Sequence, residues 1–244
     1  MAKAYLLLWL EAPLQSWGHD SKFGRRDTLN FPTKSGILGL LCCALGKGGA
    51  QREFLTEFSQ LPQIIITYAR SRKNANNEMI KIDSEPLLRD FHMIGSGYND
   101  KDPWQRLLIP KTREGKKAVG GGAKLTYRYY LQDARFAVIM EIPGNQATAL
   151  EHALQNPVWD LYLGRKSCVP TDFIYRGIFE SEQQARAEAK KIAEEKSLLE
   201  DFQVWDGEHD GDETFTLTDV PVCFGEYKQY RDRRVTLIYH NDEL

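Results

Sequence analysis

The sequence predicts an α+β protein with a ferredoxin-like body, in the split βαβ order that an RNA-recognition motif shares. The chain opens with an almost continuous apolar run over 4–10, typical of a strand buried on both faces. An apolar helix follows Pro32 and a β-branched strand follows Pro62. A further strand, helix and strand are predicted over 136–179. The predicted order is therefore strand, helix, strand, strand, helix, strand.

The first helix is predicted from the segment Phe31–Leu41. Pro32 keeps Phe31 extended, so the helix begins after it, and Thr33 or Ser35 can cap its first turn. A helix start with free N–H groups, Lys34 and two hydroxyls suits a phosphate. The alternative is a plain core helix whose polar start faces water.

The remaining elements are predicted from hydrophobic periodicity and from residues that begin or end helices and strands. Gly46 to Gly49 ends the first helix. Ser181 opens a capping box, which predicts a helix to about Lys196. The other predicted elements are a helix over 52–58, strands over 64–68, 136–142 and 173–179, a helix over 146–154, and strands over 202–205, 214–217 and 235–239. We expect a body over 1–180 and a C-terminal extension over 181–244, made of a helix and a small β unit.

A long insertion interrupts the body from about residue 70 to residue 133. It is rich in glycine and charge, and Thr126–Leu131 has the tyrosine content of a returning strand. A loop this long inside a compact domain is usually functional or disordered. The composition predicts a two-stranded arm with a loose tip.

Basic residues surround the triple glycine of this arm. A flexible basic arm can follow a phosphate backbone, and Tyr127, Tyr129 and Tyr130 can stack on bases. The alternative is a solvated hairpin whose tyrosines pack inward in alternation. The candidate contacts here are Lys111, Arg113, Lys116, Lys117, Lys124 and Arg128.

Two other stretches are candidates for RNA contact. The turn Gly164–Pro170 carries Arg165, Lys166 and Ser167, which suit a phosphate or a base edge, although a plain surface turn has the same composition. The loop before the first helix carries Arg25 and Arg26.

The turn Gln15-Ser16-Trp17-Gly18 leaves two alternatives open. Trp17 can stack on an unpaired base while Gln15 and Ser16 bond to its edge. It can equally fill the space beneath the first helix.

The composition favours a globular protein with an uneven charge distribution. The formal net charge is −2, with clustered cations before about residue 130 and an acidic stretch over 194–213. The four cysteines lack metal-ligand spacing, and Gly46-Lys47 fails the P-loop pattern. We therefore expect no cofactor and no metal. The apolar N-terminal run is too short for a membrane span, so we expect a cytoplasmic protein.

Four stretches of the chain are informative together: Gln15–Gly18, Phe31–Gly39, Tyr130–Phe136 and Leu163–Cys168. In order and spacing they resemble the CasD family, which comprises the Cas5-type subunits of type I-E CRISPR Cascade. The resemblance implies a ferredoxin-like body with a thumb hairpin. It implies antiviral defence through a non-catalytic subunit that binds and caps the 5′ handle of the crRNA. It also implies contacts with the backbone subunit CasC and the large subunit CasA, and with target DNA only through the assembled complex. Carried over to this chain, the handle contacts are Gln15, Ser16, Trp17, Lys34, Ser35, Arg165, Lys166 and Ser167.

A second function class is a metal-independent endoribonuclease that processes repeat RNA, as type I-C relatives are. Cleavage needs an acid or base beside the 2′-hydroxyl and a cation for the phosphate. His19, His92, Tyr98 and Lys34 are the residues that would have to serve.

Overall fold

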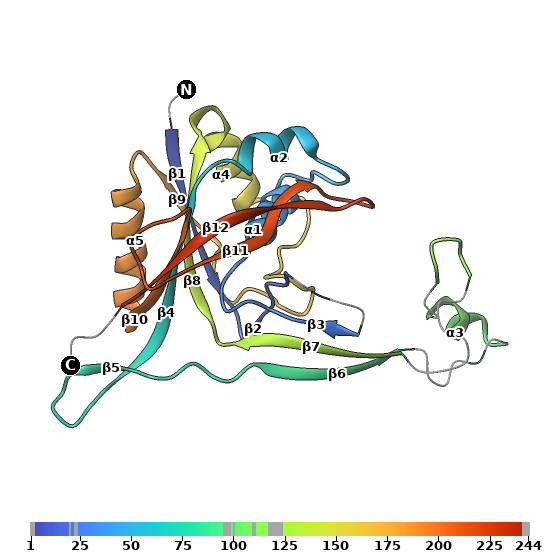
Figure 1. Ribbon diagram of the computed structural model, residues 1–244, viewed down its shortest axis with the longest axis horizontal. Coiled ribbons are helices and arrows are strands. Elements are labelled where there is room, and N and C mark those ends of the chain that lie inside the picture. The colour runs from blue at the N-terminus through green and yellow to red at the C-terminus, as the bar shows by residue number, and fades with distance from the viewer. Residues whose placement is uncertain are drawn as a thin grey trace.

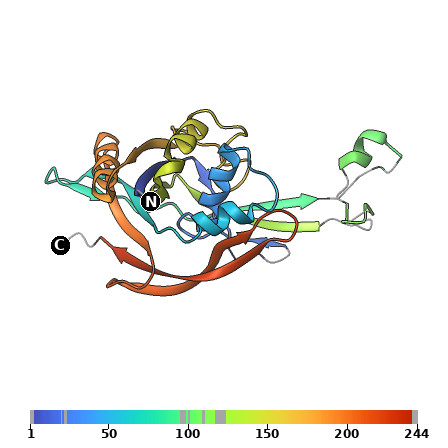
Figure 2. The same cartoon turned by 90° about the horizontal axis from the view of Figure 1, so that it is seen from above.

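The computed structural model describes residues 3–19, 21, 24–94, 99, 101–108, 111–116 and 124–240. The protein has a mixed α+β body built on one antiparallel sheet, and a long two-stranded arm extends from one end of it (Figures 1 and 2). Among the residues described, no helix combines the length and the apolar character that crossing a bilayer requires.

The six predicted body elements are present in the predicted order. They are β1 (Lys3–Glu11), α1 (Lys34–Ala44), β4 (Gln63–Lys73), β8 (Arg135–Pro143), α4 (Ala147–Gln155) and β9 (Tyr175–Phe179). In the sheet these strands lie in the order β4-β8-β1-β9. The short helix α2 (Arg52–Phe58) and the 3₁₀ turn η1 (Gly144–Gln146) complete this part.

Strand β1 is buried on both faces, as its composition predicts. Leu6, Leu8 and Leu10 pack with α1 and α4 on one face of the sheet. Leu7 and Trp9 pack on the other face with α5 (Glu182–Glu195), which Figure 1 shows alone on that side. An RNA-recognition motif binds bases on its sheet face. Here α5 covers that face, so RNA needs another surface.

The C-terminal strands continue the main sheet. Ser181 caps α5 by accepting a hydrogen bond from the backbone N–H of Gln184, as the capping box predicts. The strands β10 (Leu198–Asp206), β11 (Glu213–Cys223) and β12 (Gln229–Tyr239) follow. Because β10 pairs with β4, the sheet order is β11-β12-β10-β4-β8-β1-β9. The expected small β unit is thus an extension of the body sheet.

The arm consists of β6 (Leu88–Ile94) and the returning strand β7 (Lys124–Gln132), which confirms the predicted hairpin. The short strands β2 (Leu14–Gln15) and β3 (Arg25–Arg26) also pair with β7 and fasten the arm to the body. Strand β5 (Met79–Lys81) pairs with the end of β4. The helix α3 (Pro103–Leu108) near the tip was not expected from the sequence.

Candidate nucleic-acid interface

The first turn of α1 is capped, and its free N–H groups already have an anionic partner. The Thr33 hydroxyl accepts a hydrogen bond from the Gly36 N–H at 3.1 Å, and the Ser35 hydroxyl donates to it. The Lys34 N–H donates to the Asp219 carboxylate at 2.7 Å, and Asp219 is fully buried. A helix start does attract an anion here, as the dipole argument expects. That anion comes from β11 of the same chain.

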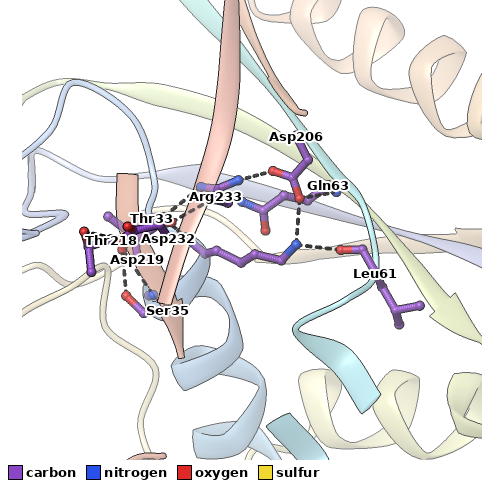
Figure 3. A network of polar contacts seen from close by, with 11 residues as sticks. Thr33, Ser35, Leu61, Gln63, Asp206, Thr218, Asp219, Asp232 and Arg233 are labelled. Atoms are coloured by element: carbon purple, nitrogen blue, oxygen red, sulfur yellow. Dashed lines mark hydrogen bonds and ion pairs between the residues drawn. The ribbon is translucent and has the colours of Figure 1, made fainter. Parts of the chain in front are cut away.

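The side chain of Lys34 is buried in a charge network. Figure 3 shows the other charged members of this network, Asp206, Asp219 and Arg233. Its ammonium donates to the Leu61 carbonyl at 2.7 Å and pairs with Asp206 at 2.6 Å. Arg233 joins the two carboxylates, with a fork of bonds to Asp219 at 2.6 and 2.7 Å and a further bond to Asp206. Burial lowers the pKa of Lys34, and the Asp206 charge offsets this only in part.

This network corrects the phosphate-binding expectation for Lys34. The ammonium points into the body, where it contacts two protein oxygens, the Leu61 carbonyl and the Asp206 carboxylate. Ser35 is half-buried beside it. Asp206, Asp219 and Arg233 were not singled out from the sequence, because no local pattern links residues so distant along the chain.

The turn Gln15–Trp17 also faces inward, which decides between the two alternatives for Trp17. Its indole is 1% exposed and donates to the Gln15 side chain at 3.1 Å. The Gln15 amide donates to the carbonyls of Leu10 and Ala134, and the Ser16 hydroxyl to that of Tyr129. All three residues are buried, so in this structure they support the arm base and do not reach bases.

Glycines allow the three motif stretches to meet. A Cβ on Gly36 would lie 2.8 Å from the Trp17 ring, so the absence of a side chain at this glycine leaves room for the indole. Gly164 has φ +99°, and a Cβ there would lie 1.8 Å from the Ser16 carbonyl oxygen. The Ser16 N–H donates to the Leu163 carbonyl beside it. The Gly164–Cys168 turn is therefore fixed against the Gln15–Trp17 turn.

Three segments bring cations together at the base of the arm. In the parallel pairing of β3 with β7, Arg26 lies opposite Arg128. Arg165 donates to the Arg26 carbonyl at 3.2 Å, and its guanidinium lies 4.7 Å from the centre of the Tyr130 ring. Lys166 and Ser167 are exposed in the same turn. Within the described part of the chain, Arg26 and Lys166 form no ion pair. We call Arg26, Arg128, Arg165 and Lys166 the arm-base cluster.

The tyrosines of β7 differ in their surroundings, and one of them lies beside Arg25 of β3. Arg25 lies 5.0 Å from the centre of the Tyr129 ring and pairs with Asp27 at 2.7 Å. Tyr130 is buried, whereas Tyr127 is exposed and its ring centre lies 5.7 Å from that of Phe91 in a tilted arrangement. The arm therefore combines both sequence alternatives, with one tyrosine packed inward and another presented outward.

The basic residues of the arm tip have different surroundings. Lys111 and Lys116 are exposed. Arg113 pairs with Glu226 at 2.8 Å. Lys117 and the side chain of Lys124 lie outside the described residues.

The acid–base candidates do not form a constellation in the described residues. His19 lies in the loop after β2 and His92 on β6, and neither ring has a hydrogen-bond or ion-pair partner there. Lys34 is buried, and Tyr98 lies outside the described residues. In that same part of the chain no cluster of His, Cys, Asp and Glu has the geometry of a metal site.

Comparisons with known proteins agree on one family. A family model described as "CRISPR-associated protein (Cas_Cas5)" matches residues 5–236. The CRISPR system Cascade subunit CasD of Escherichia coli (strain K12) is 30% identical over 191 residues, which cover 76% of this chain and 75% of that protein.

Two solved structures are similar in fold. A chain of a CRISPR RNA-guided surveillance complex aligns with a TM-score of 0.67 at 24% identity, covering 96% of this chain and 89% of the other. A crystal structure of a Cas protein aligns with a TM-score of 0.58 at 26% identity, covering 96% and 94%.

Proposed function

Since the chain belongs to the Cas5 family of CRISPR-associated proteins, we propose that it binds the 5′ handle of a crRNA and caps one end of a type I-E Cascade complex. The name of the E. coli relative supports the assignment to Cascade. The strand order β4-β8-β1-β9 supports describing the body as ferredoxin-like. The proposed partners are the backbone subunit CasC and the large subunit CasA, in the cytoplasm, with target DNA reached only through the complex.

The observation that carries this proposal is the arm-base cluster. Cations from β3, β7 and the Gly164–Cys168 turn converge there, although they are far apart in the sequence. Two of them, Arg26 and Lys166, have no carboxylate partner in the described residues. Arg165 keeps a buried Nη1 group without a hydrogen-bond partner. An unpaired buried donor is costly, so this guanidinium keeps bonding capacity that the described protein groups do not use.

Salt dependence of RNA binding tests the cluster directly. Removing one cation that neutralises a phosphate of single-stranded RNA lowers the slope of log K against log salt by about 0.7. We expect Arg26→Ala and Lys166→Ala each to lower the slope by that amount in titrations with handle RNA. Lys190→Ala on α5 is the matched control, since its side chain is 78% exposed on the opposite side of the sheet. Unchanged affinity and slope in both cluster variants would place the RNA elsewhere.

We propose a non-catalytic role for the chain. Its support is the burial of Lys34, together with the finding that neither the His19 ring nor the His92 ring has a hydrogen-bond or ion-pair partner in the described residues. The test is incubation of the purified protein with labelled repeat RNA in EDTA. A defined cleavage product would favour the endoribonuclease alternative.

A further inference from the structure

A row of side chains crosses the main sheet on the face that α1 covers. Strand pairing places five residues opposite one another, on β1, β8, β4, β10 and β12 in turn: Leu10, Phe136, Thr67, Phe202 and Tyr239. Directly opposed residues of neighbouring strands share one face of a sheet. Thr67 is the smallest side chain of the row and lies between two phenylalanines. Its size leaves a gap in an otherwise bulky row.

A cavity of about 270 Å³ lies at this gap, with Thr67, Phe202 and Tyr239 in its lining. The opposite wall comes from the arm base and from the link between β5 and β6, residues 82–87. The Ile82 N–H donates to the Arg70 carbonyl at 2.8 Å, and the Gln132 amide donates to the Pro86 carbonyl at 2.8 Å. Figure 1 shows this link passing below the lower ends of β4 and β8. The wall is therefore fixed to both the body and the arm.

The charged residues of this lining fall into two groups. Asp83 and Glu85 are exposed on the link and form no ion pair in the described part of the chain. The other charged groups are paired: Arg70 with Asp133 at 2.5 Å, Arg135 with Glu11 at 3.3 Å and Asp201 with Lys81 at 3.9 Å. The unpaired charge at the mouth of the cavity is therefore negative.

We propose that this cavity receives an aromatic side chain from a basic segment of a partner protein. Its volume lies just below the range of about 300–1,000 Å³ typical of pockets for drug-sized ligands, so it suits a single side chain. Ile82 and Tyr239, each 39% exposed, give the mouth an apolar rim of the kind that marks protein contacts. An aromatic ring brings a large apolar area and packs well against the ring of Tyr239.

The unpaired carboxylates favour a protein over a nucleic acid as the occupant. A base that entered the cavity would bring its phosphates towards Asp83 and Glu85, which repel them. Lysine or arginine residues beside an aromatic residue would pair with the same carboxylates. Such exposed pairs add little affinity, but they speed association and exclude partners of like charge. The cavity shares no residue with the arm-base cluster, so this inference goes beyond RNA binding.

A basic aromatic peptide tests the occupant. The probe is Gly-Lys-Phe-Lys-Gly with blocked ends and 4-fluorophenylalanine at its centre, titrated with the full-length protein and followed by ¹⁹F NMR. Competition with unlabelled peptides then measures the contribution of each group. A competitor with alanine in place of phenylalanine should bind about tenfold more weakly, as for an interface hot spot. A competitor with glutamate in place of both lysines should be weakened at least as much.

Filling the gap tests the place of binding. Thr67→Phe puts a ring into the cavity and should weaken binding of the probe about tenfold. Thr67→Val is the matched control, because it keeps the shape of the side chain and removes only a buried hydroxyl that has no hydrogen-bond partner in the described residues. It should bind the probe like the unmodified protein. A thermal melt of both variants shows whether the fold is kept.

Reversing the charges at the mouth tests the same site without touching the core. Asp83→Lys combined with Glu85→Lys should also weaken binding of the probe about tenfold, because both side chains are exposed and would then repel its lysines. Glu53→Lys combined with Glu57→Lys on α2 is the matched control, since both are exposed and the change in net charge is the same. It should leave binding unchanged. This pair decides the outcome if Thr67→Phe does not fold.

Three results overturn the proposal. They are no binding of the probe to the unmodified protein, equal binding by the charge-reversed and unmodified proteins, and displacement of the probe by adenosine 5′-monophosphate at a lower concentration than by the unlabelled peptide. The last result would assign the cavity to a nucleotide. Titration with handle RNA separates this proposal from the proposed function, because Thr67→Val and the charge-reversed variant should both keep the RNA affinity of the unmodified protein.

Discussion

Two residues that resemble RNA contacts from the sequence have structural roles instead. Lys34 and Trp17 both lie next to polar, glycine-containing stretches, where an exposed cation or ring is a reasonable expectation. Each has a partner that sequence proximity does not reveal. Asp206 of β10 holds the lysine, while α1 closes over the indole at Gly36. Their substitution should therefore affect stability before it affects RNA.

Trp17→Ala should cost about 3–5 kcal/mol of unfolding free energy, because it removes a large buried aromatic from the core. Urea denaturation at neutral pH measures this directly. Trp159→Ala is the matched control, since that indole is 47% exposed and should cost far less. A stable Trp17→Ala protein with weakened RNA binding would instead support base stacking.

Lys34→Ala should destabilise the protein by about 3 kcal/mol, because the partly buried Asp206 carboxylate loses one of its two cationic partners. The folded fraction should keep the salt slope of the unmodified protein. Lys166→Ala should behave in the opposite way, with unchanged stability and a lower slope. Parallel denaturation and RNA titrations on the two variants distinguish them, and a reversed pattern would return Lys34 to the RNA site.

At the scale of elements, the arm presents an apolar face to solvent. The cross-strand pair Phe91 and Tyr127 is 54% and 41% exposed, and the next pair, Met93 and Leu125, is 52% and 45% exposed. Two-stranded hairpins are marginal on their own, and here β2 and β3 support the base. Exposed apolar faces of this kind often mark protein contacts. We propose that this face meets the backbone subunit.

The double variant Phe91→Ser and Tyr127→Ser should reduce co-purification with the backbone subunit at least tenfold, because it removes the central apolar pair. Its melting temperature should change little, since both rings lie on the exposed face of the arm. Met79→Ser on β5 is the control, with 41% exposure outside the arm. Normal assembly of the double variant would exclude this face.

At the scale of the whole molecule, a second charge cluster joins the end of β1 to the end of α5 and to two other segments distant in the sequence. Glu11 at the end of β1 pairs with Arg135 at 3.3 Å and with Lys196 at 2.9 Å. Lys196, just after α5, also pairs with Asp172 at 2.8 Å. Burial alone would raise the pKa of Glu11, but hydrogen bonds from Trp9 and Lys196 outweigh it and leave the pKa below its ordinary value.

This lowered pKa predicts an acid-sensitive contribution to stability. The unfolded state takes up the Glu11 proton first as the pH falls, so the contribution is complete above about pH 4.5 and is lost as the pH falls through the folded pKa. Glu11→Gln should cost about 2 kcal/mol at neutral pH and flatten the loss of stability below that point. Denaturation curves between pH 3 and 7 measure it, and parallel curves for the two proteins would contradict it.

The sequence by itself determined the local elements and their order. The cap at Thr33, the capping box at Ser181 and the returning strand of the arm were all predictable, because each depends on residues only a few positions apart. The resemblance to the Cas5 family could be recognised for the same reason, because each of its motifs is a short continuous stretch.

Only the tertiary structure decided which surfaces those elements bury. It placed β10 beside β4, Asp219 at the start of α1 and Glu226 against Arg113. Two residues of the same type thus have opposite environments: Lys34 is a buried ion-pair partner, whereas Lys166 is an exposed cation. The physical reason is that desolvation is set by the packing of segments distant in the chain, whereas helix caps and strand periodicity are set by neighbours.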